Sequence, residues 1–310
     1  MSAPHAPVLL QEILQAFSDC KLHTFVDGTL GAGGHAQAVL EAHPELVHFV
    51  GIDQDPQARA IAQERLTPWK QKIRLVPGNF KDLDRHLTHL GIEQVDGILL
   101  DLGVSSMQLD QPEKGFSFMR EGPLDMRMDP SNPLTAEIIV NTWLEQDLAR
   151  VFWDFGEEKQ GRQAARAVVK ARNLKPLKTT KDLANVLYPV LKGKAKKSIH
   201  PLTLVFQALR IVVNGELDAL ELVLPQAIRR LRSGGRLAVI SFHSLEDRLV
   251  KNMFLYEASD KENTSGLAGL FLDKQPVVKL VTRKPLVATE AETEINPRSR
   301  SAKLRVAEKL

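Results

Sequence analysis

The chain has 310 residues, of which 43% are hydrophobic and 25% charged, with a formal net charge of +3 at pH 7. These values are ordinary for a globular protein. The single cysteine, Cys20, excludes an internal disulfide and a cysteine-rich metal site, and the nine histidines lack the H-E-x-x-H spacing of a zinc site. No apolar stretch approaches the ~20 residues of a membrane span, and no signal sequence is recognisable, so we expect a cytoplasmic protein without a resident metal.

The first informative feature is a Gly-rich turn that follows an apolar strand. Residues 24–26 predict the strand, and the turn reads DGTLGAGGH at residues 27–35. Its glycines, Gly31, Gly33 and Gly34, permit a sharp turn and a close approach of the backbone to a ligand.

A second strand ends in an acidic residue about 20 positions after this turn. A helix is expected over residues 35–41, and the apolar run at residues 47–52 leads directly to Asp53. A carboxylate at the tip of the second strand of a βαβ unit can accept hydrogen bonds from ribose hydroxyls. The turn and the acid together predict a pocket for a nucleoside-containing cofactor.

The negative charge beside the turn indicates which cofactor the turn would bind. A dinucleotide site reads G-x-G-x-x-G and holds a pyrophosphate, which a carboxylate at Asp27 would repel. S-adenosylmethionine (AdoMet) carries a sulfonium and an ammonium group, so an acid beside the turn favours it over NAD. The chain has no G-x-x-x-x-G-K-[ST] motif of nucleoside triphosphatases. We therefore predict a methyltransferase.

The remaining elements predict an α/β core that a helical insertion interrupts. Strands alternating with helices imply a parallel, doubly wound sheet, and helices alone are expected between residues 115 and 214. We expect a discontinuous core of residues 1–114 and 215–310 around an inserted helical domain, 115–214. Strands are expected at 73–77, 95–102 and 236–241, helices at 56–66, 135–155, 160–172, 180–191, 201–213 and 216–231, and an antiparallel pair at 277–282 and 302–308 around a loop, 283–300.

Positive charge is concentrated in this insertion. Residues 159–215 contain 13 Lys or Arg and one acid, Asp182, a formal charge of +12, so the rest of the chain carries −9. Such a patch fits sequence-independent phosphate contacts with a nucleic acid. The insertion is therefore predicted to bind nucleic acid.

Several longer segments resemble one family, the bacterial small-subunit (16S) ribosomal RNA (cytosine-N4) methyltransferases, RsmH or MraW. The resemblance extends in order from His5 to Arg305. It implies a Rossmann-like class I AdoMet-dependent methyltransferase core with an inserted helical domain. The segments are HAPVL (5–9), DGTLGAGGH (27–35), DLGVSSMQLD (101–110), GFSF (115–118), PLDMRM (123–128), FGEE (155–158), FQALRI (206–211), ISFHSLEDR (240–248) and RSAKLR (300–305).

The family's activity, partner and cofactor pocket follow from this resemblance. It implies methylation of the exocyclic amine of a cytidine near the decoding site, with small-subunit rRNA or the 30S particle as the partner. The oligomeric state stays open between monomer and homodimer. The implied AdoMet pocket falls on Gly33, Gly34, His35, Asp53, Phe80, Asp101 and Gln108. The Gly-rich turn adds Asp27 and Gly31 to this prediction.

The chemistry requires positioning more than acid or base strength. The N4 lone pair of cytosine is delocalised into the ring, so the amine must be held in line with the methyl group, with acceptors on its N–H bonds. Many amino-methyltransferases carry an Asn/Asp/Ser-Pro-Pro-aromatic loop after the fourth strand, whereas this chain has DLGVSS at residues 101–106. We therefore only hypothesise that Asp101, Ser105 or Ser106, and His243 contact the target base.

Three other functions remain open at this point. A nicotinamide oxidoreductase would share the core but would leave Asp27 and the basic insertion unexplained. A non-catalytic RNA-binding ribosome assembly factor would not need an intact cofactor loop. A DNA amino-methyltransferase is the nearest enzymatic alternative, because the residues alone do not separate RNA from DNA.

Overall fold

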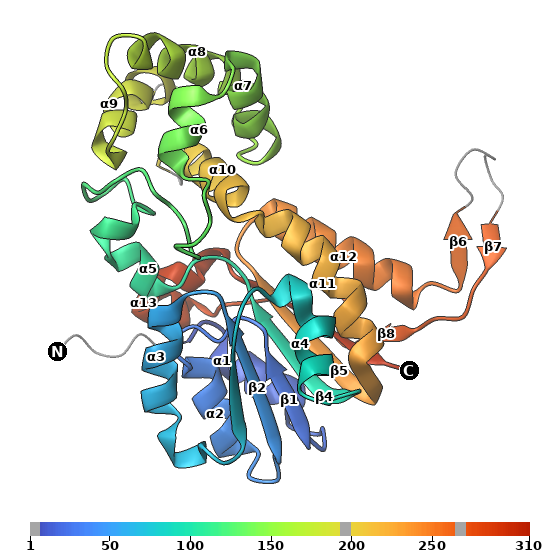
Figure 1. The fold of residues 1–310 in the computed structure, drawn as a ribbon. Helices are drawn as coiled ribbons and strands as arrows, with labels where there is room; N and C mark the ends of the chain where they lie inside the picture. Colours follow the sequence, from blue (N-terminus) through green and yellow to red (C-terminus); the bar gives the residue numbers. More distant parts are fainter. Residues whose placement is uncertain (1–6, 193–199, 264–270) are drawn as a thin grey trace. The chain divides into compact units, whose positions relative to one another are not determined.

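The computed structural model describes residues 7–192, 200–263 and 271–310, and the chain forms two compact units (Figure 1). The first unit combines residues 1–103 and 217–310, and the second comprises residues 104–216. The second unit begins earlier than the expected insertion at 115–214, because Val104 and Leu109 pack against its hydrophobic core. No helix in the described ranges is long and apolar enough to cross a membrane.

The first unit is built on an eight-stranded sheet with the order β3-β2-β1-β4-β5-β10-β8, and β9 pairs with β10. Strands β1 to β5 pair in parallel, whereas β10 is antiparallel to β5 and to β8. The strand order reverses between β1 and β4, the point where doubly wound sheets bind ligands. The strands are β1 (Thr24–Asp27), β2 (His48–Asp53), β3 (Ile73–Pro77), β4 (Val95–Asp101), β5 (Leu231–Ser241), β8 (Val278–Leu280), β9 (Leu286–Val287) and β10 (Lys303–Lys309).

Helices cover both faces of this sheet. Successive strand residues point to opposite faces, so Phe25 and Phe49 pack in one layer and Val26 and Val50 in the other. Burial on both faces explains why these strands read as continuous apolar runs. The first layer contains α1 (Leu10–Phe17), α2 (Gly34–Ala42) and α3 (Pro56–Arg65), and the second contains α4 (Leu83–His89), α11 (Glu216–Arg230) and α12 (Ser244–Ala258).

The C-terminal part of this unit confirms one expectation and corrects another. Strands β8 and β10 form the expected antiparallel pair. The expected loop at 283–300 is wrong, since it contains β9, the helix α13 (Glu290–Ile295) and part of the 3-10 helix η4 (Pro297–Ser301). The side chain of Thr289 caps α13 by accepting from the Glu292 N–H at 3.1 Å, a local signal that the polar composition concealed. The shorter elements are η1 (Thr67–Trp69), η2 (Phe80–Asp82) and the pair β6 (Lys261–Asn263) and β7 (Phe271–Asp273).

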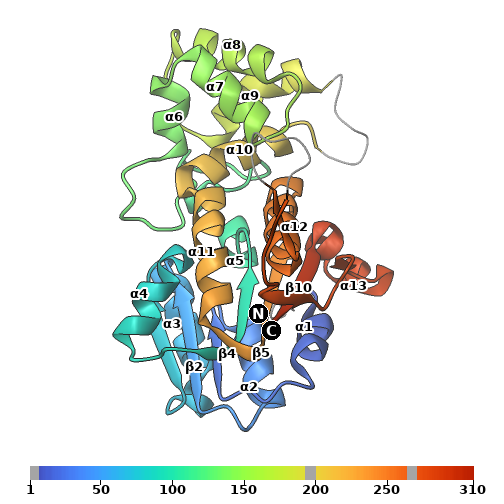
Figure 2. The same cartoon turned by 90° about the vertical axis from the view of Figure 1, so that its right-hand side faces the viewer.

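The regular elements of the second unit, among the residues that the structure describes, are helices joined by loops, with one isolated bridge between Pro123 and Thr179. In both views α6 to α9 gather together, with α10 beside them (Figures 1 and 2). The apolar faces of these helices enclose a hydrophobic core that is separate from the two core layers of the first unit. The helices are α5 (Ser106–Asp110), η3 (Pro112–Lys114), α6 (Ala136–Thr142), α7 (Glu145–Asp154), α8 (Gly161–Arg172), α9 (Thr180–Leu191) and α10 (Thr203–Asn214).

The single helix expected over residues 135–155 is wrong, because the chain breaks it into α6 and α7. Trp143 and Leu144 both adopt extended backbone conformations between the two helices. The break places Val140 at the end of α6 and Leu148 on α7 in the same buried core. A continuous 3.6-residue pattern on both sides of the break conceals it in the sequence.

Candidate active site

The Gly-rich turn joins the end of β1 to α2. Gly31 and Gly33 have left-handed backbone conformations, with φ of +52° and +77°. A Cβ on Gly34 would lie 2.7 Å from the Pro7 Cγ, and one on Gly33 would lie 3.3 Å from the Ala62 Cβ. The glycines are therefore needed for the packing of the turn itself, and their approach to a cofactor stays a prediction.

Asp53 ends β2 and holds the turn in place. Its Oδ2 accepts a hydrogen bond from the Gly31 N–H at 2.7 Å, and its Oδ1 accepts one from the Asp55 N–H at 2.8 Å. Burial raises the pKa of Asp53 above its ordinary value, and the two N–H donors oppose that shift. Each carboxylate oxygen has two lone pairs, so Asp53 retains capacity to accept further hydrogen bonds.

Asp27, His35 and Asp101 surround the point where the strand order reverses. Asp27 ends β1, is 2% exposed, and accepts a hydrogen bond from the Thr29 N–H at 3.0 Å. Burial raises its pKa to about 7. Asp101 ends β4, and its N–H donates to the Thr29 Oγ1 at 2.6 Å, so Thr29 links the ends of the two strands.

His35 approaches the same carboxylate from α2. Its Nε2 lies 3.5 Å from the Asp101 Oδ2, and the ring is buried. Within the described residues, neither ring nitrogen of His35 nor the Oδ1 of Asp101 has a hydrogen-bond partner. Buried polar atoms without partners are rare in proteins and call for an explanation such as a ligand. These orphaned atoms lie beside Asp27, so the donor set fits a polar ligand that carries positive charge.

Phe80 lies at the same edge of the sheet. It opens η2 after β3, is half-buried, and packs against the core layer that includes Val26. Its Cβ is 3.3 Å from the position of a Cβ on Gly28, the first residue after β1. Phe80 thus combines core packing with a position next to the Gly-rich turn.

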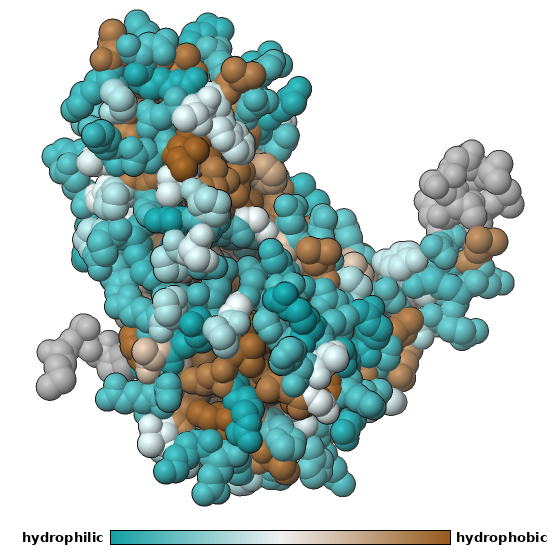
Figure 3. Space-filling model, in the orientation of Figure 1, coloured by the Kyte–Doolittle hydropathy of each residue, from teal (hydrophilic) through white to brown (hydrophobic). Residues whose placement is uncertain are grey.

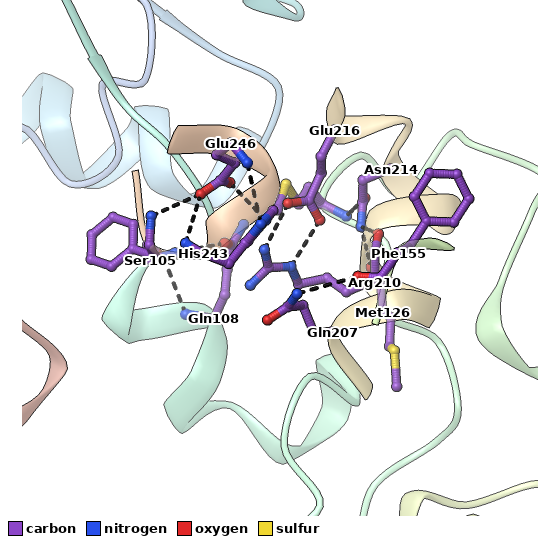
Figure 4. A network of polar contacts seen from close by, with 12 residues as sticks. Ser105, Gln108, Met126, Phe155, Gln207, Arg210, Asn214, Glu216, His243 and Glu246 are labelled. Atoms are coloured by element: carbon purple, nitrogen blue, oxygen red, sulfur yellow. Dashed lines mark hydrogen bonds and ion pairs between the residues drawn. The ribbon is translucent and has the colours of Figure 1, made fainter. Parts of the chain in front are cut away.

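Ser105 and Gln108 belong to the second unit and are bonded to each other. The Ser105 Oγ accepts from the Gln108 N–H at 3.2 Å, and the Gln108 Oε1 accepts from the Ser105 N–H at 3.0 Å, a capping box that starts α5 (Figure 4). Ser106 is the first residue of α5, and its side chain lies outside what the structure describes. The predicted roles of these three residues toward cofactor or base stay predictions.

His243 follows β5 in the first unit and caps the start of α12. Asp101 is in register with Ile240, so His243 lies just beyond the same edge of the sheet. Its Nδ1 accepts from the Glu246 N–H at 3.4 Å, and its Nε2 lies 3.1 Å from the Glu246 Oε1 (Figure 4). Glu246 is 2% exposed, and its Oε2 accepts from the N–H groups of Phe242 and His243. Glu246 was not among the residues predicted from the sequence, although its place three residues after the cap is the capping-box spacing.

A second overlooked group fixes the end of α10 in the second unit. The guanidinium of Arg210 donates from Nε and Nη2 to the two carboxylate oxygens of Glu216, both at 2.8 Å (Figure 4). The Asn214 Nδ2 donates to the backbone carbonyl oxygens of Met126 and Arg210. Paired contacts of this kind fix geometry as well as charge.

Comparison with known proteins identifies the family. The model of the MraW methylase family matches residues 2–310. The chain belongs to the MraW methylase family. Ribosomal RNA small subunit methyltransferase H of Protochlamydia amoebophila (strain UWE25) is 59% identical over 308 residues, which cover 99% of this chain and 98% of that protein. The proteins of the same name from Carboxydothermus hydrogenoformans and Geotalea uraniireducens are each 47% identical, over 310 and 307 residues, and cover 100% and 99% of this chain and 99% and 98% of those proteins.

Membership of the MraW methylase family confirms the resemblance found in the sequence motifs. The doubly wound sheet confirms the expected α/β class, and its antiparallel β10 between β5 and β8 completes the Rossmann-like core of this methylase. The structure brings Asp27, His35 and Asp101 together at one edge of that core, with Asp53 and Phe80 on the neighbouring strand ends.

Proposed function

We propose that this methylase transfers a methyl group from AdoMet to N4 of a cytidine near the decoding site of 16S ribosomal RNA, in the cytoplasm. Family membership and three relatives named ribosomal RNA small subunit methyltransferase H support the reaction and the substrate class. The main support is the contact of the buried His35 with the half-buried Asp101 beside Asp27, at the reversal of strand order, where the His35 ring nitrogens and the Asp101 Oδ1 have no hydrogen-bond partner among the described residues.

The residues present fit AdoMet, which supplies an electrophilic methyl group on a sulfonium. Asp27 and Asp101 offer negative charge to its cationic end, and His35 offers an unused ring nitrogen. Asp53 holds Gly31 and keeps lone pairs for the ribose hydroxyls. Phe80 provides an aromatic face for adenine, and Gly33 and Gly34 complete the part of the proposed pocket that lies in the first unit.

The target amine is a weak nucleophile, so the residues around it act by orientation. Asp101 Oδ1 accepts no hydrogen bond from described residues, and we assign it as the acceptor for an N4 hydrogen. Such an acceptor stabilises positive charge that develops on the nitrogen as its bond to the methyl carbon forms. His243 is assigned to position the base. The His243 Nδ1 already accepts from the Glu246 N–H, which leaves Nε2 as the proton-bearing nitrogen of the neutral ring.

The basic second unit supplies the substrate contacts in this proposal. Arg162, Arg166 and Lys170 are exposed on α8 at intervals of four residues, which places them on one face of the helix. The visible surface of this unit is mostly hydrophilic, with hydrophobic residues scattered singly or in small groups (Figure 3). Phosphate contacts from such a row are independent of sequence and sensitive to salt. Because the reacting amine is in a base, the nucleotide must be unpaired or flipped out of its helix.

Methyl transfer from labelled AdoMet to small ribosomal subunits tests this function directly. The subunits come from a strain that lacks the corresponding gene, with naked ribosomal RNA and duplex DNA as parallel substrates. Incorporation into the subunit RNA supports the proposal. Incorporation into DNA alone would replace it with a DNA amino-methyltransferase. Tight RNA binding without AdoMet binding would replace it with a non-catalytic assembly factor.

A further inference from the structure

Three aromatic rings of the second unit form a nearly parallel stack at the surface. The ring centroids of Phe118 and His200 are 4.5 Å apart with an interplanar angle of 20°, and those of Tyr188 and His200 are 6.0 Å apart with an angle of 25°. Tyr188 is 45% exposed, His200 is exposed, and Phe118 is half-buried. The stack therefore presents ring surface to solvent at Tyr188 and His200, while Phe118 packs against the core of the second unit.

Hydrogen bonds fix the segment that carries Phe118 to the start of α9, the helix that carries Tyr188. The Thr180 N–H donates to the Gly122 carbonyl at 2.8 Å, and the Thr180 Oγ1 donates to the Arg120 carbonyl at 2.9 Å. The Leu124 N–H donates to the Lys178 carbonyl at 2.9 Å. The segments that carry the two outer rings, Phe118 and Tyr188, are thus hydrogen-bonded to each other through their backbones.

The third ring is held at the start of α10. The His200 Nδ1 accepts from the Leu202 N–H at 3.3 Å, and its carbonyl accepts from the Thr203 N–H at 3.0 Å. Phe206 on α10 packs edge-on against Phe118, with centroids 5.2 Å apart, and is buried. Rings ordered before a ligand arrives lose little side-chain entropy on binding.

Positive side chains accompany these rings along the chain. Arg120, Lys181 and Lys192 are exposed, and the two lysines lie seven residues before and four residues after Tyr188. Both intervals return to the same side of a helix. Glu121 pairs with Lys181 at 3.8 Å, and the carboxylate of Asp182 is held in the cap of α9. Exposed aromatic faces beside cationic side chains are the combination that binds single-stranded nucleic acids, because every base has a face that can stack.

We propose that Phe118, Tyr188 and His200 form a stacking surface for an unpaired base of the RNA substrate. This inference rests on the proposed function, which supplies RNA as the ligand. The bases of a duplex are stacked on each other, so the surface selects a single-stranded segment. Phosphate contacts from α8 would add to the affinity for RNA, and this contribution depends on salt, unlike base stacking.

The test measures the binding of a short fluorescein-labelled single-stranded oligoribonucleotide by fluorescence anisotropy. Tyr188→Ala should weaken binding about five- to tenfold, the lower part of the range for loss of one base–aromatic stack. Tyr188→Phe keeps the ring and should bind like the parent protein. Phe118→Leu keeps apolar packing against Phe206 but removes the stacking face, and should weaken binding to a similar degree.

The other tyrosine of the chain provides a matched control. Tyr256 is 46% exposed on α12 of the first unit, and the Lys274 Nζ lies 3.9 Å from its ring centroid. Tyr256→Ala removes an equally exposed ring and should leave RNA binding unchanged. The thermal unfolding temperature of each variant is measured as well. A variant that binds weakly but unfolds at the parent temperature has lost binding without losing its fold.

The salt dependence of binding separates base stacking from charge. Tyr188→Ala should lower the affinity by the same factor at low and high salt, and binding to the matching RNA duplex should not change. If folded Tyr188→Ala and Phe118→Leu both bind single-stranded RNA like the parent, the stacking surface is wrong while the proposed function stands. If the parent protein methylates no RNA and binds none, the proposed function itself fails.

Discussion

The Nε2 of His35 lies 3.5 Å from the Oδ2 of Asp101, and the two side chains come from different elements, α2 and β4. Both ring nitrogens of His35 and the Oδ1 of Asp101 lack hydrogen-bond partners within the described ranges. The pair stands where the strand order reverses, next to the buried Asp27. A cationic ligand bound here would donate to the Asp101 Oδ1, which has no partner among the described residues.

Asp101→Asn should reduce methyl transfer about 100- to 1,000-fold, the usual effect of removing one group that stabilises developing charge. Asparagine preserves the size of the side chain, so thermal stability should stay close to that of the parent. Single-turnover rates at saturating AdoMet measure the effect. Asp260→Asn, an exposed substitution in the first unit, is the control and should transfer methyl groups at the parent rate.

Cofactor affinity should depend on the ionisation of Asp27. Its pKa of about 7 means that the carboxyl becomes negative as the pH rises through neutrality. A cationic ligand prefers the charged carboxylate, so AdoMet affinity should rise between about pH 6 and pH 8. Calorimetric titrations across this range measure it, and Asp27→Asn should bind more weakly with a flatter pH profile. An identical profile in the variant would exclude Asp27 as the group responsible.

The same carboxyl should destabilise the cofactor-free fold at neutral pH. Between the ordinary aspartate pKa of 3.8 and the folded value of about 7, the unfolded chain releases the proton of Asp27 while the folded chain retains it. The contribution of this group to the free energy of unfolding therefore falls as the pH rises through that window, and it levels off above it. Asp27→Asn should accordingly unfold at a higher temperature than the parent at pH 8, with a smaller difference at pH 4.

Substitutions at His243 separate its capping contact from a role in the reaction. His243→Ala removes the side chain that caps α12 and should cost about 1 kcal/mol of stability. His243→Asn keeps a capping oxygen, so this variant should unfold close to the parent temperature. Its rate of methyl transfer should still be at least about tenfold below that of the parent, as expected for loss of a positioning residue. Full activity in a stable His243→Asn variant would restrict this histidine to the cap.

Replacing Arg162, Arg166 and Lys170 with alanine should weaken RNA binding and reduce its dependence on salt. For single strands, the logarithm of the association constant decreases with the logarithm of the salt concentration. This slope becomes shallower by about 0.7 for each phosphate that the protein no longer neutralises, so a total change of about 2 is expected. Alanine at Lys70, Lys81 and Lys251, which are exposed in the first unit, removes the same charge and should leave the slope unchanged. Equal changes in both variants would show that net charge alone governs binding.

The sheet and the acids at its edge were predictable because their signals are local. Apolar runs mark β1, β2 and β4, and Asp27, Asp53 and Asp101 end them. Since the carboxyl ends of parallel strands meet at one edge, the sequence places these acids close to one another. The proximity of His35 to Asp101 depends on how α2 packs on the sheet, which no spacing in the chain records.

Other features depend on tertiary contacts or on weak local signals. The break at Trp143 interrupts a pattern that reads as one helix, because each half buries its apolar side in the same core. Helix α13 lies in a polar stretch, where the side chain of Glu292 accepts the Leu9 N–H at 2.7 Å across 283 residues. The pairing of Arg210 with Glu216 and of His243 with Glu246 involves spacings of six and three residues, which many unpaired charges share.

Nucleoside mass analysis of the methylated subunit RNA tests the central claim most directly. After reaction with labelled AdoMet, the RNA is digested to nucleosides and the labelled product is compared with methylated cytidine standards. We predict N4-methylcytidine in the small-subunit RNA, formed about 100- to 1,000-fold more slowly when the Asp101→Asn variant replaces the parent protein. Label in 5-methylcytidine, in another nucleoside, or in none of the small-subunit RNA would contradict it.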